Sequence, residues 1–193
     1  MSNLNVYGLQ AKNATTNKIS LSSGNIIYAP DTLIQTVTSR SDLRTQYSSL
    51  PSGNGTTISE LNITIAPKLA SSLLLITWMI NGEMHQDNVF TIHQDGTLIT
   101  STGYEGYNNV LGNVRWSGVM SAFYDRNESS TPSNWFLQYA VPAGNTSSRT
   151  YAPATRSSSA GTFTLAFNRT LANSVSDSQE SMVSTAMIME IMQ

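Results

Sequence analysis

Hydrophobic and polar residues alternate along most of this chain, with the two-residue period that is typical of β-strands. In 162–168, for example, Phe163, Leu165 and Phe167 alternate with small or polar residues. No stretch has the caps and the amphipathic period of a helix several turns long. The predicted strands lie at 32–38, 58–65, 73–80, 89–93, 97–100, 114–124, 135–141, 150–153, 162–168 and 182–192. Their number and spacing predict an all-β fold, either a β-sandwich or a jelly roll.

Turn residues and prolines add detail to this pattern. Asp95-Gly96 lies between two predicted strands, which is a strong signal for a hairpin. Asn81-Gly82 is a similar signal, either for a second hairpin or for a bend within one strand. The run 73–80 is apolar on both faces, as in a central strand that is covered on both sides. Because Pro153 has no N–H to donate, 150–153 is predicted to be a short edge strand.

The last predicted strand is apolar on both of its faces. A terminal strand of a monomer would normally keep one polar face toward water. An outward apolar row therefore indicates a subunit interface, and the flexible thioethers of methionine suit such a contact. The candidate interface residues are Val183, Met187, Ile188, Met189 and Ile191.

The first 38 residues differ from the rest of the chain. Residues 1–38 hold short apolar pieces separated by polar turns, too few to close a hydrophobic core. We expect them to form an extended arm that packs on another chain, with disorder as the alternative. Residues 39–193 are predicted to form the sandwich domain.

The composition favours a structural protein over a catalyst. Only 11% of the 193 residues are charged, about a quarter are Ser or Thr, and none is Cys. With a net charge of −2, the chain has no basic field that would attract nucleic acid or an anionic membrane surface. The start shows no signal peptide, and the run 73–80 is too short to cross a bilayer. We therefore expect neither nucleic acid nor membrane as a partner.

The ionisable residues select no catalytic site. His-Gln-Asp occurs twice, and its four ionisable residues could ligate a metal or simply be polar strand and turn residues: His85, Asp87, His93 and Asp95. There is no Gly-x-Ser-x-Gly nucleophile elbow, and no two carboxylates are selected by their spacing for glycoside hydrolysis. We expect no enzyme activity, no cofactor and no bound metal.

Aromatic residues in predicted loops offer a different function. Tyr104 and Tyr107 lie in one loop, and Asp125 and Arg126 lie in another. Tyrosine rings can stack on sugars while the polar groups bind hydroxyls, and Tyr124 and Tyr151 are further candidates. The alternative is that these rings pack on their own sandwich or on a neighbouring subunit.

Several stretches of the chain resemble virion proteins of marine and cyanobacterial tailed phages. They read "NIIYAP", "ITWMINGEMHQDNVFTIHQDGTLI", "NVRWSG", "YDRNESSTPSNWFLQY" and "STAMIMEIM". The resemblance covers most of residues 26–192 and implies a homotrimeric jelly roll of the tumour-necrosis-factor and complement type. In such domains the last strand runs near the threefold axis.

The resemblance implies a structural role in the virion. We expect a trimeric capsid decoration (cement) protein or short appendage on the capsid surface or the tail. Residues 1–38 would anchor it to the major capsid protein or to neighbouring virion proteins. The alternative is a tail-fibre or head-fibre tip module that recognises host-surface glycan.

Overall fold

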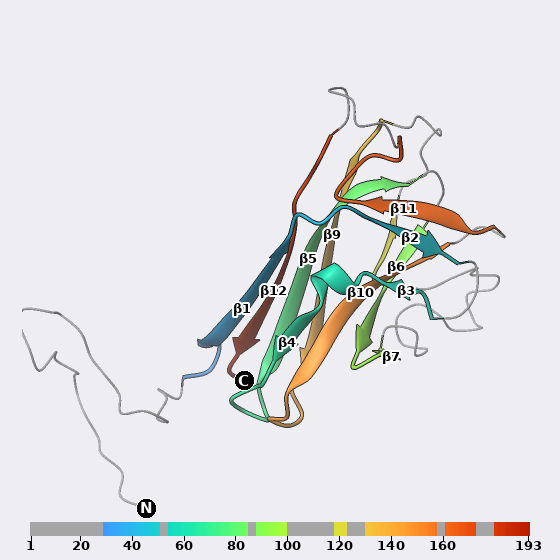
Figure 1. Ribbon diagram of the computed structural model, residues 1–193. Helices are drawn as coiled ribbons and strands as arrows, with labels where there is room; N and C mark the ends of the chain where they lie inside the picture. Colours follow the sequence, from blue (N-terminus) through green and yellow to red (C-terminus); the bar gives the residue numbers. More distant parts are fainter. Residues whose placement is uncertain are drawn as a thin grey trace, which may run out of the picture.

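The computed structural model describes residues 29–50, 54–84, 88–99, 118–122, 130–157, 161–172 and 180–193, with the backbone alone for 120–122. These residues form a β-sandwich of two antiparallel sheets (Figure 1), which confirms the all-β prediction. In the part of the chain that is described, no helix is long and apolar enough to cross a membrane.

The first sheet, sheet A, is built around the long strand β5. Its strands are β1 (Leu33–Ser41), β2 (Thr45–Ser49), β5 (Leu73–Met84), β9 (Ser133–Pro142), β11 (Phe163–Phe167) and β12 (Ser184–Ile191). β9 pairs with one side of β5 over its whole length. The other side of β5 pairs first with β12 and then with β11. β1 lies beyond β12, and β2 lies beyond β11.

The second sheet, sheet B, is built around β10. Its strands are β3 (Thr56–Thr57), β4 (Ile63–Ile65), β6 (Asn88–Gln94), β7 (Thr97–Leu98), β8 (Met120–Ala122) and β10 (Arg149–Ser157). β10 pairs with β6 on one side and with β3 and β4 on the other. A short 3-10 turn, η1 (Ser59–Leu61), joins β3 to β4.

The hydrophobic core lies between the two sheets. Trp78 on β5 is fully buried, and its indole N–H donates to the Leu61 carbonyl at 3.1 Å. The largest fully buried side chains come from both sheets and from η1: Trp78, Tyr151, Phe90, Phe167, Ile58, Leu61, Ile65, Leu74, Ile76, Ile80, Ile92 and Leu137. Burial of so many large apolar groups provides the main driving force for folding.

The two turn signals in the sequence have different outcomes. Asp95 and Gly96 form the predicted hairpin between β6 and β7, with φ angles of 50° and 80°. Positive φ at both positions is the geometry of a two-residue turn whose twist matches the flanking strands. Asn81-Gly82, in contrast, makes no turn, because β5 runs straight through it. A side chain at Gly82 would collide with the Ala166 carbonyl of β11, so glycine is required there by close packing.

The prediction that 150–153 is a short edge strand is wrong, since β10 is the central strand of sheet B. Pro153 is tolerated because β3 and β4 leave a gap opposite it. The Pro153 carbonyl accepts the Ile58 N–H at 2.8 Å in this gap. A strand residue directs its N–H and its C=O to the same side, so the donor that proline lacks would have pointed into the gap.

The expected boundary after residue 38 falls inside β1. This strand pairs with β12 from Leu33 to Ser41, and Val37 packs against the hydrophobic core. The chain enters the sandwich beside its C-terminal end, where the Asp31 N–H donates to the Met192 carbonyl at 2.8 Å. Residues 33–38 therefore belong to sheet A and not to an arm.

Glu190 is a fully buried carboxylate on the core side of β12. Its oxygens accept from the backbone N–H groups of Lys68 and Leu69, from the Ser72 hydroxyl and from the Gln35 amide, at 2.5–3.0 Å. Burial by itself raises the pKa of this carboxyl, but the four donors together hold the pKa below its usual value. Glu190 thus fastens β1 and the β4–β5 connection to β12.

We expect Glu190→Gln to lower the free energy of unfolding by about 1–3 kcal/mol at neutral pH, since a neutral amide replaces an acceptor of charge-assisted hydrogen bonds. The folded-state pKa is lowered, so this stabilisation is present above the unfolded pKa of about 4.3 and is lost as the pH falls through the folded value. Urea unfolding of both proteins between neutral and acidic pH measures the difference. A difference that stays constant on acidification would contradict this role.

Candidate interaction surface

The side chains of β12 alternate between the hydrophobic core and the outer face of sheet A. Ala186 and Ile188 point into the core, and Ile188 is fully buried. Met187, Met189 and Ile191 point outward and are half-buried. The prediction that Ile188 belongs to a subunit interface is therefore wrong, because its side chain already packs inside its own sandwich.

The outward row of β12 continues across the neighbouring strands. The register places Met187 beside Thr77 of β5 and Met189 beside Leu75. The same rows reach Gln138 and Ala140 of β9, and on the other side Thr36 and Thr38 of β1. We call this four-stranded surface the outer face of sheet A.

The outer face exposes large apolar side chains. Phe136 is 55% exposed and lies beside Met79, which is 44% exposed. Leu33 is 52% exposed at the opposite corner of the face, beside Ile191. Val183, just before β12, is 40% exposed. Apolar residues that gather on one sheet face in this way are typical of contact surfaces, whereas single exposed ones need no explanation.

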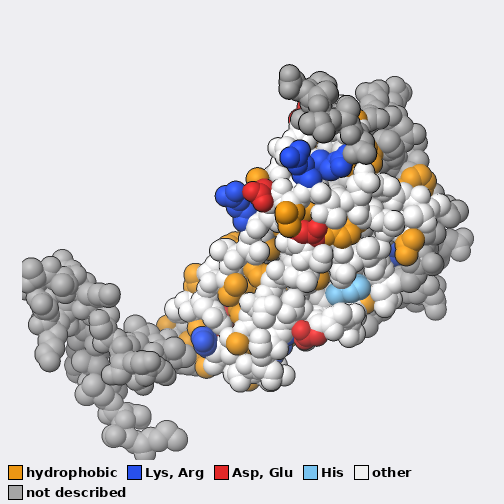
Figure 2. Space-filling model, in the orientation of Figure 1, with side chains coloured by type: hydrophobic (Ala, Val, Ile, Leu, Met, Phe, Trp, Pro, Cys, Tyr) orange, Lys and Arg blue, Asp and Glu red, His pale blue; other side chains and the backbone are white. Residues whose placement is uncertain are grey.

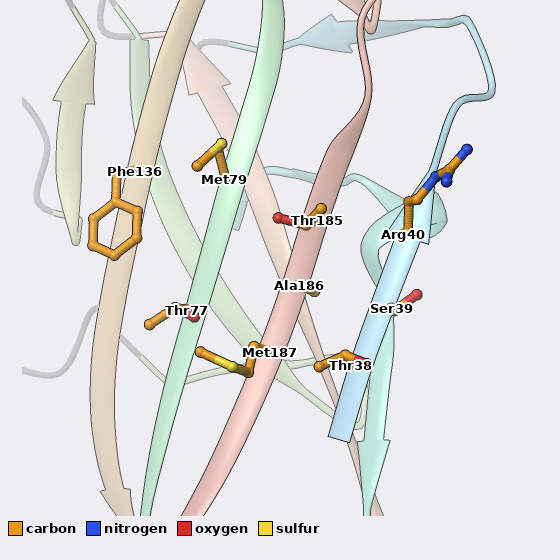
Figure 3. Close-up of a pocket in the computed structure, with 9 residues that line it drawn as sticks. All are labelled: Thr38, Ser39, Arg40, Thr77, Met79, Phe136, Thr185, Ala186 and Met187. Carbon is orange, nitrogen blue, oxygen red and sulfur yellow. The ribbon is translucent and has the colours of Figure 1, made fainter. Parts of the chain in front are cut away.

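A shallow hollow of about 520 Å³ lies in the middle of the outer face (Figure 3). Phe136 and Met79 border one side of it, and Met187 projects toward Thr77. Its lining residues come from four adjacent strands: Thr38, Ser39, Arg40, Thr77, Met79, Phe136, Thr185, Ala186 and Met187. Met side chains have several rotatable bonds, so this surface can adapt to a partner that inserts a side chain.

The residues that line the hollow are mostly apolar or carry hydroxyl groups. Among the described residues, the lining contains hydroxyl groups and one cation, Arg40, but no carboxylate and no imidazole. Arg40 lies 3.7 Å from the Asp42 carboxylate, and both side chains are about 70% exposed.

The wider surface is also poor in charge. In the view of Figure 2, uncharged polar side chains and backbone make up most of the surface, and hydrophobic side chains emerge among them. Binding to such a surface would bury few charges, and the desolvation of charges is the most costly kind.

The other predicted site residues have structural roles or lie outside the described residues. The His93 Nε2 donates to the Asn54 carbonyl at 2.9 Å, and the Asp95 carboxylate accepts the Thr150 N–H at 2.8 Å. Tyr151 is fully buried in the core, so it offers no ring to a sugar. Several candidates lie outside the described residues, and their metal-binding or glycan-binding roles remain predictions: His85, Asp87, Tyr104, Tyr107, Tyr124, Asp125 and Arg126.

The sequence pattern predicted that the outward residues of β12 form a contact surface. It did not predict that this surface extends across β5 and β9. Met79 lies in the run 73–80, which was predicted to be covered on both sides, and Phe136 lies in a predicted strand with no stated exposure; both side chains are exposed. A signal was present in 135–141, where Trp, Phe and Leu occupy consecutive positions. A strand directs successive side chains to opposite faces, so such a run must place one large apolar side chain on the outer face.

Comparisons with known proteins found only distant similarities, all of them to solved structures. No protein-family model matches the chain, and no curated protein matches it. A solved sugar-binding protein, the EclA C-terminal domain, aligns over 78% of this chain and 86% of its own, with 14% identity and a TM-score of 0.32. The structure of the Gx strain of infectious bursal disease virus aligns over 91% of this chain but 41% of its own, with 15% identity and a TM-score of 0.35. A VP2 subviral particle of infectious bursal disease virus gives 13% identity and a TM-score of 0.33. At such low TM-scores these alignments carry no argument about function.

Proposed function

We propose that this chain is a structural protein of a tailed-phage virion that assembles as a homotrimer through the outer face of sheet A. The observation that carries the proposal is the exposure of Phe136, Met79 and Leu33 on one continuous sheet face. A chain with no cysteine gains stability when such a face is buried against identical copies. The virion assignment is supported by the resemblance of residues 26–192 to tailed-phage virion proteins.

The proposed assembly places the Met-rich row of β12 between subunits. A threefold ring uses two different patches of each copy, and we propose that both lie on or beside the outer face, away from β4. Val183, Met187, Met189 and Ile191 remain candidates for this contact, because all four lie on or beside the outer face. The proposed place of the trimer is the capsid surface or a short appendage.

Sedimentation velocity of the purified protein tests this function. We expect a single species with the mass of three chains at micromolar concentration. A folded protein that sediments as a monomer at this concentration would rule out assembly through the outer face.

We propose that residues 1–28 attach the trimer to the capsid or to a neighbouring virion protein. A chain that starts at residue 29 keeps all the described strands, so we expect it to remain folded and trimeric but to lose binding to virion particles. A chain that starts at residue 42 lacks β1 and should be destabilised, because β12 loses its pairing partner on that side and the core contact of Val37 is lost. Thermal unfolding and co-sedimentation with particles lacking this protein measure the two effects. Full particle binding by the chain that starts at residue 29 would contradict the anchoring role.

A further inference from the structure

The chain contains two Asn-Gly pairs, and they lie in opposite environments. Asn54-Gly55 precedes β3 at the surface, whereas Asn81-Gly82 lies within the central strand β5. In such a pair, the backbone nitrogen of the second residue can attack the side-chain amide carbon of the asparagine. Glycine favours this attack because it has no Cβ to obstruct the approach and because its backbone is permissive.

The side chain of Asn54 is exposed, and none of the described residues holds it. The hydrogen bonds of Asn54 to the described residues run through its backbone carbonyl. This oxygen accepts from the His93 Nε2 at 2.9 Å and from the Thr91 hydroxyl at 3.3 Å. The carbonyl thus fastens the segment before β3 to β6, while the carboxamide can turn toward the Gly55 nitrogen.

Asn81 is held at every polar group. Its side-chain amide donates to the Val183 carbonyl at 2.7 Å, and its side-chain oxygen accepts from Asn134 at 2.9 Å. Its backbone N–H donates to the Ser184 hydroxyl at 2.9 Å, and its carbonyl accepts the Asn168 N–H at 2.8 Å. The attack would require this part of β5 to leave the sheet first.

We propose that Asn54 is a site of spontaneous deamidation and that Asn81 is protected by the fold. The Gly55 nitrogen gives its proton to solvent and forms a bond to Cγ of Asn54. The bond from Cγ to the amide nitrogen breaks, and ammonia leaves with a proton from solvent. Water then opens the resulting succinimide at one of its two carbonyls, which yields aspartate or isoaspartate with no oxidant or reductant involved.

Isoaspartate at this position would change the contact with sheet B. Its main chain runs through the side-chain carbon, so the backbone becomes longer by one atom and gains a free carboxylate. The residue 54 carbonyl would then no longer reach His93 and Thr91 in the same geometry. Deamidation would therefore loosen the segment before β3, whatever the function of the protein.

Peptide mapping of the aged full-length protein tests the proposal. The protein is incubated at mildly alkaline pH, and aspartate and isoaspartate are followed by mass spectrometry in the two peptides that contain Asn54 and Asn81. We expect conversion at Asn54 and at least about tenfold slower conversion at Asn81, which must wait for local unfolding of β5. In urea the two rates should converge, and Asn54→Gln should remove the acidic species that forms in the folded protein.

The proposal is decided by the deamidation rates of Asn54 and Asn81, compared in the folded protein and in urea. Equal rates at the two sites in the folded protein would overturn the proposal, because the fold would then confer no selectivity. Conversion of Asn54 in urea but not in the folded protein would also overturn it, since the folded segment would then be protected.

Discussion

Asn168→Asp is expected to lower the free energy of unfolding by about 3–5 kcal/mol, a large part of the stability of an ordinary domain. Asn168 is fully buried and follows β11 with a φ of 55°. Its side-chain amide donates to the carbonyls of Ser41 and Leu43 at 2.9 and 3.0 Å, and its side-chain oxygen accepts the Ser184 hydroxyl at 2.6 Å. One side chain thus joins the β1–β2 connection to the start of β12.

Aspartate has the same shape, so the substitution changes the chemistry alone. A carboxylate oxygen would face two carbonyl oxygens in place of a donor, and a charge would be buried without a cationic partner. The matched control is Asn62→Asp, an exposed position at the end of η1, where we expect a change within about 0.5 kcal/mol. Urea unfolding at one protein concentration measures both variants. An equal loss in the two variants would show that Asn168 does not hold these segments together.

Met187→Asp is expected to abolish assembly while leaving the sandwich folded. In a single copy Met187 is half-buried at the side of the hollow, where water still reaches a carboxylate. Between two copies the same carboxylate would be buried at a cost of several kcal/mol, and Arg40, the cation in the described lining of the hollow, already lies beside the Asp42 carboxylate. Because about 1.4 kcal/mol is tenfold in affinity, we expect at least about a thousandfold weaker association.

Two further variants separate assembly from folding. Thr64→Asp changes an exposed residue on sheet B and should leave the trimer intact. Ile188→Asp should unfold the chain, because this position is fully buried between the sheets. Light scattering and circular dichroism distinguish the cases. If Met187→Asp remained trimeric, the outer face of sheet A would not be the interface.

Strands with strong local patterns could be predicted from the sequence. The hairpin at Asp95-Gly96 was correct because its signal is local: two residues with positive φ connect neighbouring strands. β5, β9, β11 and β12 were also found, since their runs of apolar residues are long enough to show a period.

Features that depend on partners distant in the sequence were missed. Asn81-Gly82 has the composition of a turn, but the approach of β11 requires the glycine for packing. Pro153 indicated an edge strand, and no local pattern reveals the gap between β3 and β4 that accommodates it. The position of β10 at the centre of sheet B is therefore a tertiary property.

The sequence predicted only part of the outer face of sheet A, because local periodicity does not show which side of a strand faces the core. β12 is apolar on both faces, so periodicity could not separate the inward Ile188 from the outward Met187. Glu190, the charged residue of this strand, points to the core, where Lys68, Leu69 and their neighbours supply hydrogen-bond donors. Those donors come from a connection far away in the sequence.

Thiol labelling of the assembled protein tests most directly whether the outer face of sheet A is buried between copies. The chain has no cysteine, so a single introduced thiol reports on one position. Thr185→Cys places it in the hollow, and Thr64→Cys places it on the exposed surface of β4 as the control. The account predicts that in the trimer the thiol at 185 reacts at least about tenfold more slowly than the thiol at 64, and that the rates converge when Met187→Asp is added. Equal reaction rates at the two positions in an intact trimer would contradict assembly through this face.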